Sequence, residues 1–210
     1  APVIAAQTCL REVVTEYSST TSRAVLQHDL SQGSNVYASV SEGYKAGGYA
    51  TYECTDAYNP EEVTALEFGF KGSLSESTSL NASIFRYDYS DFQVLQVIGI
   101  QTVTRNAGDA TVNGLEIEAV SEINDSLSVT TGLTLLDATY GAFENVNGVQ
   151  PELGVQQLEG NYLSNSPKVS LNVGLNYFQN IESGGSVTYR ANASYKSKMY
   201  FSEFNEFPQS

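Results

Sequence analysis

The sequence predicts an all-β fold: about eight long antiparallel strands, arranged up and down as part of a transmembrane β-barrel. Three observations support this prediction. Apolar and polar residues alternate along most of the chain, the alternating runs are about 10 to 17 residues long, and the breaks between them are alternately short and long. Soluble sheets usually have strands of about 5 to 6 residues, and a soluble sandwich does not need every second connection to be long.

A barrel in the outer membrane explains the alternating connections. Its strands cross the bilayer at a tilt, turn tightly at the periplasmic end and carry long loops outside the cell. Only a closed barrel pairs all the backbone groups of strands in lipid. The apolar face of each strand would then meet lipid, and the polar face, with its Lys and Arg residues, would meet a wet lumen. Alternation alone also fits a secreted soluble β-domain, because any half-buried antiparallel sheet shows it.

The strands follow in order along the chain. The first, over 21–30, is weakly patterned, and residues 1–20 have no regular period. The second, over 35–44, places small aliphatic residues on one face. The third, over 62–72, places Leu66, Phe68 and Phe70 opposite Glu67, Gly69 and Lys71.

The fourth strand, over 79–94, changes phase in its middle. Leu80, Ala82 and Ile84 are in phase, and the large residues then shift by one position to Phe85 and Tyr87. A shift of this kind indicates either a β-bulge or a strand that leaves one environment for another.

The clearest unit is a long hairpin. A turn signal over 106–109 precedes the alternating run 115–119, and the break at Asn124 and Asp125 precedes a second run over 126–135, which ends near Tyr140. Two more alternating strands are expected over 168–178 and 185–201. The long breaks cover 45–61, about 95–109 and 141–166, although 97–103 could extend the neighbouring strands.

Composition excludes several functions. The chain has 24 acidic and 10 basic residues and a net charge of −14, which argues against a nucleic-acid partner. It has no apolar run of about 20 residues, so no transmembrane helix is expected. With two cysteines and the single His28, a zinc site is not expected. No catalytic constellation is present, so we expect neither an enzyme nor a cofactor.

Cys9 and Cys54 both fall on the long-loop side of the predicted topology. A disulfide between neighbouring outer loops is possible in an oxidising compartment. The alternative is two unpaired thiols.

Five residues are candidate ligand contacts. Tyr49 and Tyr52 lie in the first long loop, where tyrosines could either stack on a ligand or form the aromatic girdle at the lipid headgroups. Arg190, Lys196 and Lys198 share the polar face of the last strand. They could attract an anionic chelate, or they could pair with acidic groups on neighbouring segments.

Six segments resemble, in the correct order, the barrel of TonB-dependent outer-membrane receptors. They are 37–49 (YASVSEGYKAGGY), 59–71 (NPEEVTALEFGFK), 80–93 (LNASIFRYDYSDFQ), 106–118 (NAGDATVNGLEIE), 133–140 (LTLLDATY) and 165–168 (NSPK).

The resemblance implies a receptor for a scarce nutrient, most simply a ferric siderophore, in the outer membrane of a Gram-negative bacterium. Family members have an N-terminal plug with a TonB box inside a 22-stranded barrel. Neither is found here, so we expect a barrel part: residues 1–20 end an extracellular loop and residues 21–210 form a partial wall. The implied partners are outer-membrane lipid, the nutrient, and the TonB complex acting through the plug.

Two other functions stay open at this point. Eight strands can close into a small barrel with a structural or adhesive role, provided that the first strand pairs with the last. A secreted soluble β-domain could instead bind a glycan or a protein.

Overall fold

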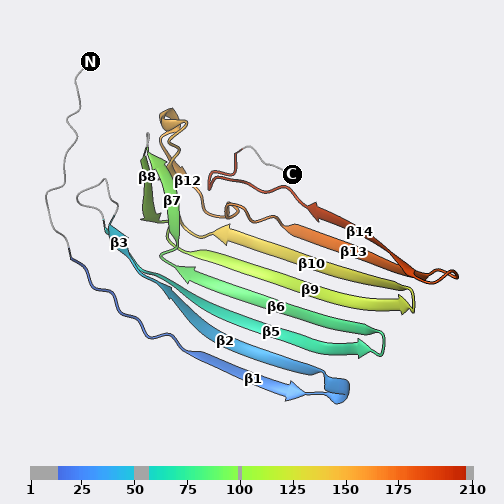
Figure 1. The fold of residues 1–210 in the computed structure, drawn as a ribbon. Helices are drawn as coiled ribbons and strands as arrows, with labels where there is room; N and C mark the ends of the chain where they lie inside the picture. The colour runs from blue at the N-terminus through green and yellow to red at the C-terminus, as the bar shows by residue number, and fades with distance from the viewer. Residues whose placement is uncertain (1–13, 50–56, 99–100, 207–210) are drawn as a thin grey trace.

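The main feature of the computed structural model, which describes residues 14–49, 57–98 and 101–206, is one antiparallel sheet of eight strands (Figure 1). Its strands are β1 (Arg23–Asp29), β2 (Asn35–Lys45), β5 (Glu61–Ser75), β6 (Thr78–Ser90), β9 (Ala110–Asn124), β10 (Leu127–Tyr140), β13 (Val169–Asn180) and β14 (Ser186–Lys196). Their order in the sheet is their order in the chain. Each strand therefore pairs with the next one along, and the prediction of an all-β, up-and-down sheet is confirmed.

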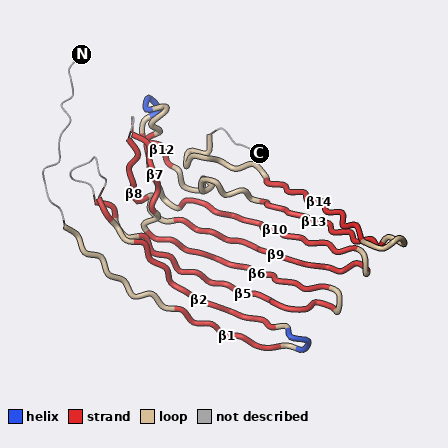
Figure 2. Tube along the Cα trace, viewed as in Figure 1, coloured by secondary structure: helices blue, strands red, loops and turns tan. Residues whose placement is uncertain are grey.

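The connections alternate as expected, with tight turns at one end of the sheet and long loops at the other (Figures 1 and 2). The long loops carry three small hairpins that the sequence analysis did not identify: β3 (Gly48–Tyr49) with β4 (Ala57–Tyr58), β7 (Gln93–Ile98) with β8 (Gln101–Asn106), and β11 (Glu144–Val146) with β12 (Val155–Gln157). The described residues contain two short 3-10 turns, η1 (Ser31–Gly33) and η2 (Pro151–Leu153), and no longer helix. Within the described ranges, no helix is long and apolar enough to cross a membrane.

The sheet is open. β1 and β14 form its two edges, and these two strands do not pair with each other in the part of the chain that the structure describes. A barrel closed by these eight strands alone needs that pairing, so the small self-closing barrel is not the observed architecture.

The register gives the whole sheet one apolar face. Phe68 of β5 lies opposite Ile84 of β6, which lies opposite Leu115 of β9. We call this side the outer face, and its large residues are exposed: Phe68 is 53% exposed and Ile84 is 56% exposed. Its apolar band contains Val36, Ala38, Val40, Leu66, Phe68, Phe70, Ala82, Ile84, Leu115, Ile117, Ala119, Leu133, Leu135, Val169, Leu171, Val173, Leu175, Tyr177, Tyr189, Ala191, Ala193 and Tyr195.

The phase change in β6 is not a bulge. The strand runs regularly to Ser90, and its pairing with β9 has no register shift. Arg86 and Asp88 follow Ile84 on the outer face, whereas Phe85 lies on the opposite face. Of the two interpretations offered by the sequence, the second is therefore correct: the strand continues out of the apolar band into a polar zone on the long-loop side.

The opposite face, which we call the inner face, is polar, and glycines on it make room for aromatic rings. The Tyr37 ring occupies the space above Gly69, because a Cβ on that glycine would lie 2.5 Å from the ring. The Tyr37 hydroxyl is hydrogen-bonded to Glu67, and the Lys71 ammonium lies 5.0 Å from the ring centroid. These contacts hold the ring in place over the strand.

We therefore expect Gly69→Val to destabilise the sheet by about 1–3 kcal/mol, the usual effect of overpacking. The matched control is Gly132→Val, also on the inner face, because a Cβ there meets nothing within 4 Å. The urea midpoint of the protein in lipid vesicles, followed by β-sheet circular dichroism, measures the difference. Equal midpoints for the two variants would contradict the packing described here.

Candidate functional site

The long-loop end of the sheet holds a small buried core. Ala110, Ala138 and Tyr140, from the ends of β9 and β10, are 1%, 3% and 4% exposed. They pack with residues from the loops, namely Val94, Ala107, Phe143, Leu158 and Leu163. Since Ala110, Ala138 and Tyr140 have the inner-face register, the long loops fold over the inner side of the sheet.

Asn106 joins two of these loops. Its side-chain amide donates to the carbonyl oxygens of Asp91 (2.6 Å) and Asn59 (3.1 Å), and its Oδ1 accepts from the Asn59 backbone N–H (2.6 Å). Gln93 reinforces the junction, since its buried amide donates to the carbonyl oxygens of Ala46 and Asn59, each at 3.0 Å. The loop after β2 and the loop after β6 are thereby held as one unit.

A second junction attaches the segment after β14 to the loop after β10. Asn205 pairs with the Tyr162 backbone, accepting from its N–H at 2.6 Å and donating to its carbonyl at 2.8 Å. The Glu203 carboxylate accepts from Asn145 (3.0 Å), whose own side-chain oxygen accepts from Gln96 of β7. The loops after β2, β6 and β10 are therefore linked by side-chain amides and carboxylates.

The segment that directly precedes β13 lies at the long-loop end of the sheet. The Lys168 ammonium lies 4.2 Å from the Tyr162 ring centroid, and Tyr162 stacks on Tyr200 with 6.4 Å between centroids. The hydrogen bond to the Tyr162 hydroxyl raises the pKa of Lys168, so this side chain stays positively charged.

On the inner face, charged residues lie on both sides of β10 and β13. Glu116 and Glu118 project from β9, whereas Arg190 and Lys196 project from β14. The exposed Arg86–Asp88 ion pair lies on the outer face, and no ion pair joins Glu116, Glu118, Arg190 and Lys196 to one another. The carboxylates of β9 and the cations of β14 are therefore not neutralised by each other.

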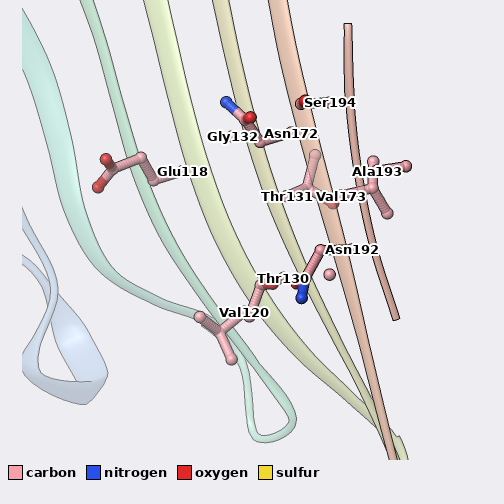
Figure 3. Close-up of a pocket in the computed structure, with 11 residues that line it drawn as sticks. Glu118, Val120, Thr130, Thr131, Gly132, Asn172, Val173, Asn192, Ala193 and Ser194 are labelled. Carbon is pink, nitrogen blue, oxygen red and sulfur yellow. The ribbon is translucent and has the colours of Figure 1, made fainter. Parts of the chain in front are cut away.

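Between these charged strands lies a shallow trough of about 530 Å³ (Figure 3). Among its inner-face residues, Glu118 is the one charged residue, Val120 is apolar, and the others are glycines or uncharged polar residues: Thr130, Gly132, Asn172, Gly174, Asn192 and Ser194. The trough is open over Gly132, where a Cβ would meet nothing within 4 Å, whereas the Thr130 and Asn192 side chains lie over Gly174.

The residues proposed from the sequence do not form one cluster. Arg190 and Lys196 lie on the inner face of β14, and the Arg190 Nε donates to Asn176 at 3.2 Å. Lys198 follows β14, with its ammonium 6.0 Å from the Tyr200 centroid. Tyr49 belongs to the loop after β2, near the opposite edge of the sheet, where its hydroxyl is hydrogen-bonded to Thr15 at 2.5 Å.

Three residues of the sequence-based proposals lie outside the described residues: Tyr52, Cys9 and Cys54. Gln93, Gln96 and the carboxylates of β9 are not among the residues predicted from the sequence. The run Leu-Glu-Ile-Glu at 115–118 carried the signal for the last of these, because strict alternation places both acids on the polar face.

Comparison with known protein families gives one match. The model described as "TonB dependent receptor-like, beta-barrel" matches residues 6–209. Comparison with curated proteins gives no significant match.

Solved structures of three receptors resemble this fold. The ferric yersiniabactin uptake receptor FyuA from Yersinia pestis has a TM-score of 0.70 and 20% identity, and the match covers 89% of this chain and 27% of that chain. The ferric preacinetobactin receptor BauA from Acinetobacter baumannii has a TM-score of 0.66 and 18% identity, and the match covers 90% of this chain and 27% of that chain. The siderophore receptor PiuA from Acinetobacter baumannii has a TM-score of 0.61 and 22% identity, and the match covers 85% of this chain and 26% of that chain. The chain thus spans about a quarter of the length of each. At these identities the likeness shows the fold.

The Asn106 junction gives a test of how the loops are held. We expect Asn106→Ala to lower the opening free energy of the loop after β2 by about 1–3 kcal/mol, because it removes three hydrogen bonds between the loops. Hydrogen exchange of residues 46–49 and 57–60 should then accelerate roughly tenfold or more, while β5 and β6 keep their protection. Asn113→Ala is the control, since Asn113 makes only a 3.5 Å contact with Arg86 on the outer face. Unchanged exchange in the Asn106 variant would show that the junction does not order this loop.

Proposed function

The chain belongs to the TonB-dependent receptor β-barrel family, and on that basis we propose that it forms part of the wall of an outer-membrane receptor that imports a ferric siderophore. Members of this family are receptors and transporters rather than enzymes. In this proposal, residues 21–210 supply barrel wall and outer loops. Residues 1–20 belong to the outer loop that precedes β1.

The observation that carries the proposal is the division of one continuous sheet into two faces. The outer face has an exposed apolar band over all the strands from β2 to β14, and the charged residues of β6 on this face, Arg86 and Asp88, lie on the long-loop side of Ile84. A soluble sandwich would have to cover this band with a second sheet, and the described residues contain none that does so. Lipid is the solvent that suits such a band, provided that further strands pair the edges at β1 and β14.

The inner face supports a filled barrel. Glu116 and Glu118 have no ion-pair partner among the described residues, and carboxylates enclosed with little water need one. A barrel of this family encloses a plug, so basic groups on a plug would form ion pairs with these carboxylates. TonB, pulling on that plug, would supply the energy for uptake.

The assignment of a siderophore rests on the similarity to the ferric yersiniabactin uptake receptor, the ferric preacinetobactin receptor and the siderophore receptor PiuA, and on the placement of cations. Tyr49 and Tyr52 would contact the ligand in the outer vestibule, and Arg190, Lys196 and Lys198 would attract an anionic chelate. A disulfide between Cys9 and Cys54 would stabilise the same outer loops.

Placement in the membrane can be tested on β5. We expect Phe68→Arg to reduce assembly in the outer membrane, because a cation near the bilayer midplane costs about 2–4 kcal/mol in a transmembrane barrel. Thr64→Arg is the matched control: it lies on the same face of the same strand, four residues away and beyond the apolar band. The fraction that resists denaturation in unheated electrophoresis samples measures assembly. Equal loss in both variants would argue against lipid at Phe68.

The ligand class can be tested by iron uptake into cells that produce the complete receptor. We expect TonB-dependent accumulation of radioactive iron from ferric yersiniabactin or ferric preacinetobactin, and a severalfold loss with Arg190→Gln. The control is Arg86→Gln, whose side chain lies on the outer face and pairs with Asp88. Recovery of the protein from the soluble fraction, or uptake that does not require TonB, would overturn the proposed function.

A further inference from the structure

The trough on the inner face is built from two neighbouring rows of the sheet. In the first row Glu118 lies opposite Gly132, Gly132 opposite Asn172, and Asn172 opposite Ser194. In the second row, Thr130 lies opposite Gly174, and Gly174 opposite Asn192. The first row is open over Gly132, where a Cβ would meet nothing within 4 Å, whereas in the second row the Thr130 and Asn192 side chains occupy the space over Gly174. Figure 3 shows Gly132 among the residues that line the trough.

The trough divides the inner face by charge. On one side, β5 and β9 carry Glu67, Lys71, Glu116 and Glu118, with the Tyr37 ring packed among them. On the other side, β14 carries Lys196 in the row next to the trough on the long-loop side, and Arg190 in the row next to the trough on the tight-turn side. The inner faces of β10 and β13 carry no charge in between: they present Ser128, Thr130, Gly132, Thr134, Ser170, Asn172, Gly174 and Asn176.

The two sides offer different contacts to whatever fills the barrel. Carboxylates, a lysine and an aromatic ring give a plug groups to pair with and to pack against, and enclosed charges are stable only when they are paired. The floor at Gly132 offers neither charge nor bulk, so packing there would leave a gap. From β9 to β14 the gap extends over three inter-strand spacings, roughly 14 Å.

We propose that the trough over β10, β13 and β14 is the section of the wall along which an imported anionic chelate passes the plug. This inference rests on the proposed function and adds the route. The volume of the trough, about 530 Å³, lies within the usual range of small-molecule sites. Its hydroxyl and amide groups can exchange hydrogen bonds with an oxygen-rich ligand without holding it. Arg190 and Lys196 favour an anion at both ends, and the carboxylates of β9 repel it from the plug-bearing side.

Thiol reactivity in the complete receptor, with Cys9 and Cys54 replaced by serine, tests this route without a ligand. Asn172→Cys and Asn81→Cys form a matched pair: both replace an inner-face asparagine, and both lie in the row that runs through Glu118, one on each side of it. The probe is 2-sulfonatoethyl methanethiosulfonate, a small water-soluble anion. We expect the thiol of the Asn172→Cys variant to react at least tenfold faster than the thiol of the Asn81→Cys variant. Equal rates, or a slower reaction of the Asn172→Cys variant, would show that the trough is filled and would overturn the proposal.

A second variant tests passage itself. Gly132→Phe should lower iron uptake at least tenfold, while binding of the ferric siderophore at the cell surface stays within about twofold. The ligand is ferric yersiniabactin or ferric preacinetobactin, according to which of the two the unaltered receptor imports. Gly132→Ala is the control, since a methyl group there meets only open space. Normal uptake by Gly132→Phe would overturn the route. Absence of uptake by the unaltered receptor, with the difference in thiol reactivity preserved, would instead refute the siderophore assignment alone.

Discussion

The structure depends on one constraint, the two-residue period of a continuously hydrogen-bonded sheet. Because successive side chains of a strand point to opposite faces, one register decides which residues are outside and which are inside across all eight strands. The pairings of Phe68 with Ile84 and of Ile84 with Leu115 carry this choice from β5 to β9. A slip of one residue in β5 or β9 would place Glu67 or Glu116 in the apolar band, so the outer face and the inner face are specified together.

This constraint also explains how much could be predicted from the sequence. The long strands, their antiparallel order and the alternation of short and long connections follow from the period alone, as the hairpin of β9 and β10 shows. β1 was the least patterned of the predicted strands, and it forms one edge of the sheet. The phase change after Ile84 looked like a possible bulge because large aromatic residues were assumed to stay on one side. The structure shows a regular strand whose surroundings change, with Phe85 turned inward.

The loops could not be predicted in the same way, since their order comes from contacts between distant residues. β7 and β11 are joined through Gln96 and Asn145, which are 49 residues apart in the sequence, and no local pattern marks such a pair. The same holds for the trough: Gly132 looks like an ordinary glycine within a strand until the register places it between Glu118 and Asn172. Individual cations such as Arg190 could be assigned to a face, but their separation from the carboxylates of β9 required the order of the sheet.

The most direct test of the account is the accessibility of spin labels placed one at a time along β5, from residue 62 to residue 74, in the membrane-reconstituted receptor. Collision with oxygen, which dissolves in lipid, and with a water-soluble nickel chelate would be measured at each position. The account predicts a two-residue period, with high oxygen accessibility at positions 66, 68 and 70 and no such signal at positions 67, 69 and 71. If positions 66, 68 and 70 were shielded from both reagents, the outer face would be packed against protein, and the assignment of this sheet to a membrane wall would be wrong.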